Sequence, residues 1–125
     1  MAYGDAEVSD KGHVVIVETD DLIHELLERW FTAEGFTVGA DGAPPARVVL
    51  VVVNVSRPGQ VDPTLEALRA RYQPAPILAI SARFRRGLAA SVEAAARLGV
   101  QKILPKPFTR EELRLAVEEA LGAVP

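Results

Sequence analysis

The sequence contains no cysteine, which excludes disulfide bonds, thiol nucleophiles and thiolate metal sites. Basic residues are not in excess, because 14 Lys and Arg stand against 17 Asp and Glu, and the formal net charge is -3. A domain with this balance carries no general signal for nucleic-acid binding. The longest apolar run, residues 48–53, is far too short to span a bilayer. We therefore expect a cytoplasmic protein with neither a nucleic-acid partner nor a membrane partner.

The chain has the size and composition of one ordinary globular domain. It has 125 residues, of which 49% are hydrophobic and 25% are charged. The first eleven residues are polar and lack the apolar core of a signal peptide. We expect a flexible leader over residues 1–11 and one domain over residues 12–123.

Short β-branched runs alternate with segments of helical periodicity. The predicted strands are residues 14–17, 36–38, 48–53, 76–80 and 100–104. One predicted helix begins near residue 22, and three others cover residues 62–72, 86–98 and 109–121. Alternation of this kind indicates an α/β fold, in which helices cover both faces of a parallel sheet.

One crossover between parallel strands is too short for a normal helix. Residues 39–47, GADGAPPAR, contain two prolines and two glycines. A parallel crossover normally needs a dozen or more residues, and proline interrupts helices. The sequence therefore predicts that the helix between the second and third strands is absent or reduced to one turn.

Polar residues follow the predicted strands where ligands bind in sheets of this kind. They are Glu18, Thr19, Asp20 and Asp21 after the first strand, Asn54 after the third, Ser81 after the fourth and Lys106 after the fifth. Simpler interpretations exist for some of them. The acidic residues can be helix caps, an interpretation we favour for Asp21, and Asn54 can be a turn residue.

Four segments, in this order, resemble the receiver domains of two-component response regulators. They are VVIVETDDLIHELLERWFTAEGFTV, VVLVVVNVSRPG, PILAISA and GVQKILPKPFTREEL. The resemblance implies a flavodoxin-like, doubly wound parallel sheet of five strands in the order 2-1-3-4-5. It also implies a bacterial phosphorelay function in signal transduction.

The resemblance assigns a role to each polar position. Asn54 stands where receivers carry the phosphoacceptor aspartate, and Ser81 matches the hydroxyl residue that senses the phosphoryl group. Lys106 matches the family's lysine, and Pro107 matches a proline preceded by a cis peptide bond. Ile103 replaces the aromatic residue that changes rotamer on activation.

The acidic pocket that holds Mg²⁺ in receivers is altered as well. It aligns with Glu18 and Thr19, with Asp20 next in the chain. Mg²⁺ prefers oxygen ligands, carboxylates among them, at octahedral angles. Two of the expected anionic ligands are missing, so we expect no cofactor and no Mg²⁺, with Glu18 and Asp20 as weak candidate ligands only.

These changes indicate a degenerate receiver, or pseudo-receiver, that is not phosphorylated at the usual site. A neutral amide is a very poor nucleophile toward phosphorus, so Asn54 is not expected to accept a phosphoryl group. Lys106 is then available to donate to the Asn54 carbonyl oxygen and to pair with Glu18 or Asp20. We expect one locked conformation, since an amide cannot imitate the charge of a phosphoryl group.

The predicted function is a signalling module, not an enzyme, that acts through protein–protein interaction. Its partner would be a histidine kinase or an output protein, and a homodimer is also predicted. Two alternatives stay open. One is an active receiver phosphorylated on another carboxylate, such as Asp20 or Asp62. The other is a small-ligand-binding α/β domain that uses the same crevice.

Overall fold

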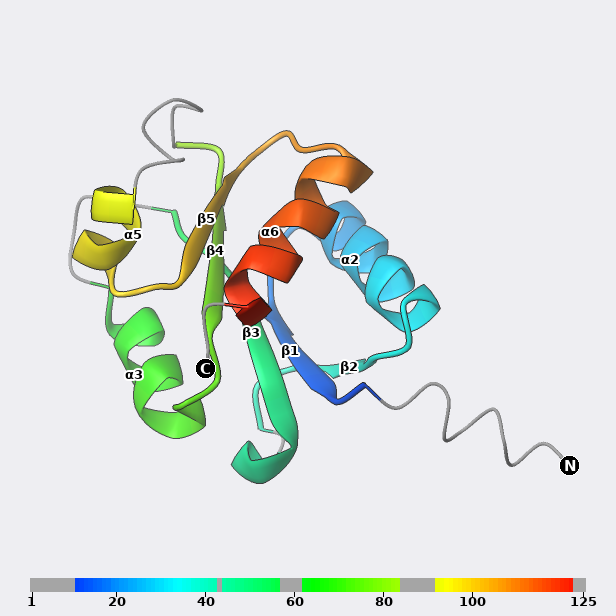
Figure 1. Cartoon of the computed structure of the whole chain (residues 1–125), viewed down its shortest axis with the longest axis horizontal. Coiled ribbons are helices and arrows are strands. Elements are labelled where there is room, and N and C mark those ends of the chain that lie inside the picture. Colours follow the sequence, from blue (N-terminus) through cyan, green and yellow to red (C-terminus); the bar gives the residue numbers. More distant parts are fainter. Residues whose placement is uncertain (1–10, 43, 57–61, 84–91, 123–125) are drawn as a thin grey trace, which may run out of the picture.

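The computed structural model describes residues 11–42, 44–56, 62–83 and 92–122 (Figure 1). It contains a five-stranded parallel sheet in the order β2-β1-β3-β4-β5, which confirms the predicted fold class. The strands are β1 (His13–Val17), β2 (Thr37–Gly39), β3 (Val48–Asn54), β4 (Ile77–Ser81) and β5 (Lys102–Pro105). The expected leader falls on residues 1–11, of which only Lys11 lies within the described residues.

Helices cover both faces of the sheet, as alternation of strands and helices predicts. They are α2 (Asp21–Ala33), α3 (Pro63–Tyr72), α5 (Val92–Leu98) and α6 (Arg110–Gly122). Figure 1 shows α2 and α6 on one face and α3 and α5 on the other. The first part of the helix predicted for residues 86–98 lies outside the described residues. None of the described helices is long and apolar enough to cross a membrane.

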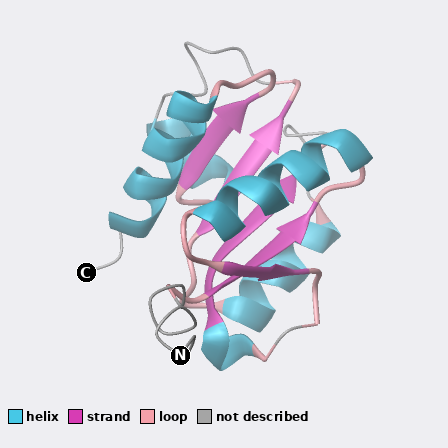
Figure 2. Cartoon of the chain, turned by 90° about the vertical axis from the view of Figure 1, so that its right-hand side faces the viewer, coloured by secondary structure: helices cyan, strands magenta, loops and turns pink. Residues whose placement is uncertain are grey.

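The shortened crossover is confirmed. Between β2 and β3 the described chain forms only η1 (Pro45–Arg47), a single 3₁₀ turn. The turned view in Figure 2 shows the sheet with its covering helices. The described chain therefore has three long crossover helices where a regular alternation would have four.

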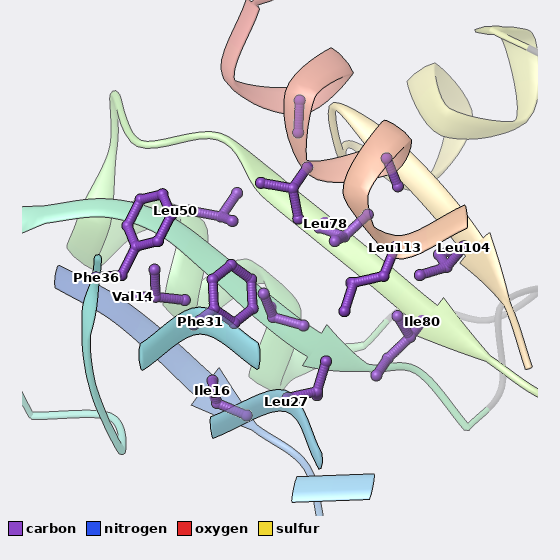
Figure 3. Close-up of a cluster of buried hydrophobic side chains, with 14 residues drawn as sticks. Val14, Ile16, Leu27, Phe31, Phe36, Leu50, Leu78, Ile80, Leu104 and Leu113 are labelled. Atoms are coloured by element: carbon purple, nitrogen blue, oxygen red, sulfur yellow. The ribbon is translucent and has the colours of Figure 1, made fainter. Parts of the chain in front are cut away.

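Each strand sends alternate side chains to two separate hydrophobic cores, as β geometry requires. One core lies under α2 and α6 and contains Val14, Leu27, Phe31, Leu50, Leu78 and Leu113 (Figure 3). The other lies under α3 and α5 and contains Val15, Val51, Leu65, Leu68, Tyr72 and Ile103. The central strands are buried on both faces, which explains their continuous apolar sequences.

The helices begin at side-chain caps. Asp62 accepts hydrogen bonds from the backbone N–H groups of Thr64 and Leu65, at the start of α3. Thr109 and Glu112 form a capping box at the start of α6. At α2 the cap is Asp20, and Asp21 is the first helical residue. The assignment of Asp21 as the cap was therefore wrong by one position.

Candidate functional site

The strand register brings the predicted site residues to one edge of the sheet. Val17 pairs with Val53 at the ends of β1 and β3, so Glu18 and Asn54 follow neighbouring positions. Asn54 pairs with Ile80, and Ser81 pairs with Pro105. Because the strands are parallel, their carboxyl ends lie along one edge of the sheet, the edge at which sheets of this type bind ligands. We refer to the end of the sheet that carries Glu18, Asn54, Ser81 and Lys106 as the crevice.

A buried ion pair lies in this crevice. Lys106 Nζ is 2.8 Å from Glu18 Oε1, and only 1% of the Glu18 side chain and 17% of the Lys106 side chain are exposed. The contact lacks the angles of a hydrogen bond, so attraction between the charges must offset the desolvation of Oε1. The other oxygen, Glu18 Oε2, accepts the backbone N–H of Asp20 at 3.0 Å. Of the two partners expected for Lys106, the structure therefore selects Glu18.

Asn54 is the last residue of β3, although the sequence placed it just after the strand. Its backbone belongs to the ladder with β4, where it is paired with Ile80. Asn54 is half-buried, and among the described residues its amide has neither Lys106 nor Ser81 as a hydrogen-bond partner. The pairing explains how a residue that usually favours turns is held in a strand.

Ser81 is fully buried at the end of β4. Its Oγ accepts the backbone N–H of Arg83 at 3.0 Å, and its carbonyl oxygen accepts the backbone N–H of Lys106 at 2.9 Å. The residue thus fixes the turn that follows β4 and ties that turn to the segment after β5.

The residues of the acidic pocket are not gathered into a cation site. Thr19 and Asp20 are exposed, and Asp20 Oδ1 accepts the backbone N–H groups of Leu22 and Ile23. The Glu18 carboxylate already neutralises Lys106. Within the described part of the chain, no three His, Cys, Asp or Glu residues form a group that could hold a metal ion. This donor set does not fit Mg²⁺, which needs several oxygen ligands at octahedral angles.

Pro107 and Ile103 are the two remaining positions to which the resemblance assigns a role. The peptide bond between Lys106 and Pro107 is cis. Ile103 is buried in the core under α3 and α5, with 2% of its surface exposed. A buried aliphatic side chain lacks the polar end that an exposed rotamer of a tyrosine would present to solvent.

A second polar cluster was not indicated by any sequence pattern. The Tyr72 hydroxyl donates to Asp41 Oδ1 at 2.5 Å and accepts the backbone N–H of Gly42 at 2.8 Å. Arg71 donates to the same Asp41 oxygen at 3.0 Å. These contacts join α3 to the loop that replaces the missing helix. They link residues about thirty positions apart, and local periodicity carries no information on such pairs.

The curated relatives of this chain include PetR and Regulator of RpoS. Protein PetR of Rhodobacter capsulatus is 33% identical over 122 residues, which cover 90% of this chain and 50% of PetR. Regulator of RpoS of Escherichia coli is 31% identical over 103 residues, which cover 75% of this chain and 30% of that protein. The chain thus spans half or less of the curated relatives it matches. No protein-family model matches the chain.

Solved structures decide the fold. A CheY-like response regulator from Mesorhizobium loti superimposes with a TM-score of 0.61 and 19% identity, covering 86% of this chain and 97% of that chain. Chemotaxis protein CheY4 of Vibrio cholerae gives a TM-score of 0.66 and 17% identity, covering 90% and 100%. The chain has the fold of response regulator receiver domains. Within this fold, the carboxyl ends of the strands carry the Asn54 amide and the Glu18–Lys106 ion pair.

Proposed function

We propose that this chain is a receiver-like module of two-component signalling that does not use phosphorylation at the usual position and acts by binding another protein. The observation that carries the proposal is the neutral Asn54 amide at the carboxyl end of β3, together with a Lys106 that is already paired with Glu18. The similarity to Regulator of RpoS supports a regulatory role. Non-enzymatic action and a cytoplasmic location are part of the same proposal.

Chemistry at the crevice supports phosphorylation-independent action. Attack on phosphorus needs an electron-rich nucleophile, and an amide is not one. The two other carboxylates considered for this role, Asp20 and Asp62, both accept backbone N–H groups at helix starts. Those bonds stabilise the helices and orient each carboxylate toward its own backbone. The alternative of a displaced phosphoacceptor therefore has no geometric support.

We propose that the partner binds along β5 and α6. A shallow groove of about 330 Å³ is lined by Lys102, Leu104, Pro105, Leu115 and Glu119, among others. Leu115 is 45% exposed, which is high for a large apolar side chain. Contact with a protein, including a second copy of this chain, would remove that surface from water.

The first test is incubation of the wild-type protein with acetyl phosphate and Mg²⁺, followed by intact-mass measurement. We expect no phosphoryl adduct. An adduct would contradict the proposal, and peptide mapping would then show whether Asp20 or Asp62 carries it. The matched control is an active receiver domain treated in the same tube, which must gain the adduct.

The second test addresses binding between copies of the chain. Analytical ultracentrifugation over a wide concentration range should show reversible dimers of the wild type, weakened in Leu115→Glu. Leu22→Glu is the control, because Leu22 is 79% exposed on α2, on a different element. Monomers alone at the highest concentration would rule out the homodimer.

A further inference from the structure

The Glu18–Lys106 pair has a consequence for what the crevice can hold. We propose that the Lys106 ammonium is the resident cation of this crevice, so that restoring a carboxylate at position 54 does not by itself create a divalent-cation site. In this arrangement the lysine supplies the positive charge that balances the buried Glu18 carboxylate, which follows β1. The inference concerns cation binding and is independent of which protein the module contacts.

Burial is the first argument. The Glu18 side chain is 99% removed from solvent, and a carboxylate in that position needs a neutralising charge. Lys106 Nζ, at 2.8 Å from Oε1, supplies that charge directly. A divalent cation would have to displace the ammonium and leave a mostly buried lysine without its partner, which is costly.

The position of Lys106 is the second argument. Its backbone N–H is bonded to the carbonyl oxygen of Ser81 at 2.9 Å, so the base of the side chain is tied to the end of β4. Glu18 is tied in turn by the bond from the Asp20 N–H to Oε2. Both members of the pair are therefore held by their own backbone contacts, which lowers the entropy lost in keeping them together.

The remaining oxygen ligands are the third argument. Asp20 is the only other acidic side chain next to Glu18 that is not part of α2, and its Oδ1 accepts two N–H groups of that helix. Recruiting Asp20 to a metal would remove the cap of α2. An added carboxylate at position 54 thus meets an ammonium and one neutralised carboxylate, and the net charge of the three groups becomes -1.

The experiment compares three full-length chains: wild type, Asn54→Asp, and Asn54→Asp combined with Lys106→Met. Each is titrated with Mg²⁺ in a thermal-unfolding assay and with Mn²⁺ by electron paramagnetic resonance. We expect no change of melting temperature for the first two. For the double variant we expect a rise of about 5 °C at a Mg²⁺ concentration ten times the dissociation constant.

Each outcome decides the matter. Binding of Mn²⁺ by Asn54→Asp as tight as by the double variant would overturn the proposal, and so would absence of binding in both. If the double variant does not fold, Asn54→Asp with Lys106→Gln takes its place, because glutamine removes the charge and still offers a polar N–H donor near Glu18. A phosphoryl adduct on the wild type would contradict the proposed function, but it would not change the comparison of cation binding among these variants.

Discussion

Glu18 and Lys106 form an ion pair, although the strands that they follow are separated by two other strands in the sheet. Glu18 follows β1 and Lys106 follows β5, whereas β3 and β4 separate these strands in the sheet order. The 2.8 Å contact therefore spans the carboxyl ends of the central strands β3 and β4, where Asn54 and Ser81 lie. It links the first strand of the chain to the last.

Removing either charge of this pair should strongly destabilise the fold. We expect Lys106→Met and Glu18→Gln each to lower the free energy of unfolding by about 3 kcal/mol, since each leaves a buried charge without its partner. The double variant should cost clearly less than the sum of the two, because its members interact directly. Urea unfolding of all four proteins measures this coupling.

The control for that cycle is an exposed pair on a neighbouring part of the fold. Lys102 Nζ lies 2.7 Å from Glu119 Oε1, but 28% of the Lys102 side chain and 58% of the Glu119 side chain are exposed. Lys102→Met should lower stability by less than about 1 kcal/mol. Equal losses for Lys102→Met and Lys106→Met would mean that burial does not set the strength of the crevice pair.

Much of the fold could be predicted from local patterns. The apolar runs located all five strands, and the composition of residues 39–47 predicted the loss of a helix that the structure replaces with η1. Asp62, followed by Pro63, predicted the start of α3 at the correct residue. These features depend on neighbours in the chain, and a sequence displays such neighbours directly.

Side-chain partners could be predicted only in part. The sequence left Glu18 and Asp20 as equal candidates for Lys106, because both follow β1 and differ by two positions. The backbone turn after β1 decides between them, by directing Glu18 inward and Asp20 to the start of α2. Similarly, Leu22 and Leu26 fit the helical periodicity of α2, yet they are 79% and 47% exposed because the helix faces the sheet through Leu27 and Phe31.

Asp20 should behave as a helix cap when it is substituted. Asp20→Ala should lower the free energy of unfolding by about 1 kcal/mol, because two N–H groups of α2 lose their acceptor. Asp20→Asn should stay within about 0.5 kcal/mol of wild type, since asparagine is an equally good cap. Chemical denaturation of both variants tests this, and an equal loss in both would show that the negative charge at position 20 is what matters.

The loop that replaces the missing helix should depend on the Tyr72 hydroxyl. Tyr72→Phe keeps the buried ring, but it leaves the Gly42 N–H without its acceptor and removes one of the two side-chain donors to Asp41. We therefore expect a loss of about 1–2 kcal/mol. Hydrogen exchange at the Gly42 amide should accelerate in the same variant.

The adjacent Arg71 provides the control for this loop. Its side chain is 53% exposed and contacts the same Asp41 oxygen, so Arg71→Ala should cost less than about 1 kcal/mol. It should also leave exchange at Gly42 nearly unchanged. Faster exchange in Arg71→Ala than in Tyr72→Phe would assign the anchor to the arginine instead.

His13 should make stability fall as the pH drops below 6.5. Burial, and in second place the positive charge of Arg47, lower the pKa of His13 from its usual value of 6.5. The unfolded chain then binds a proton at a higher pH than the folded chain, so folding stability is complete above pH 6.5 and decreases as the pH falls toward the lowered pKa. Urea midpoints at pH 7.5 and 5.5 should differ for wild type and much less for His13→Gln. His24→Gln is the control and should keep the wild-type difference. Loss of the pH dependence in His24→Gln, with none lost in His13→Gln, would assign the effect to His24 instead.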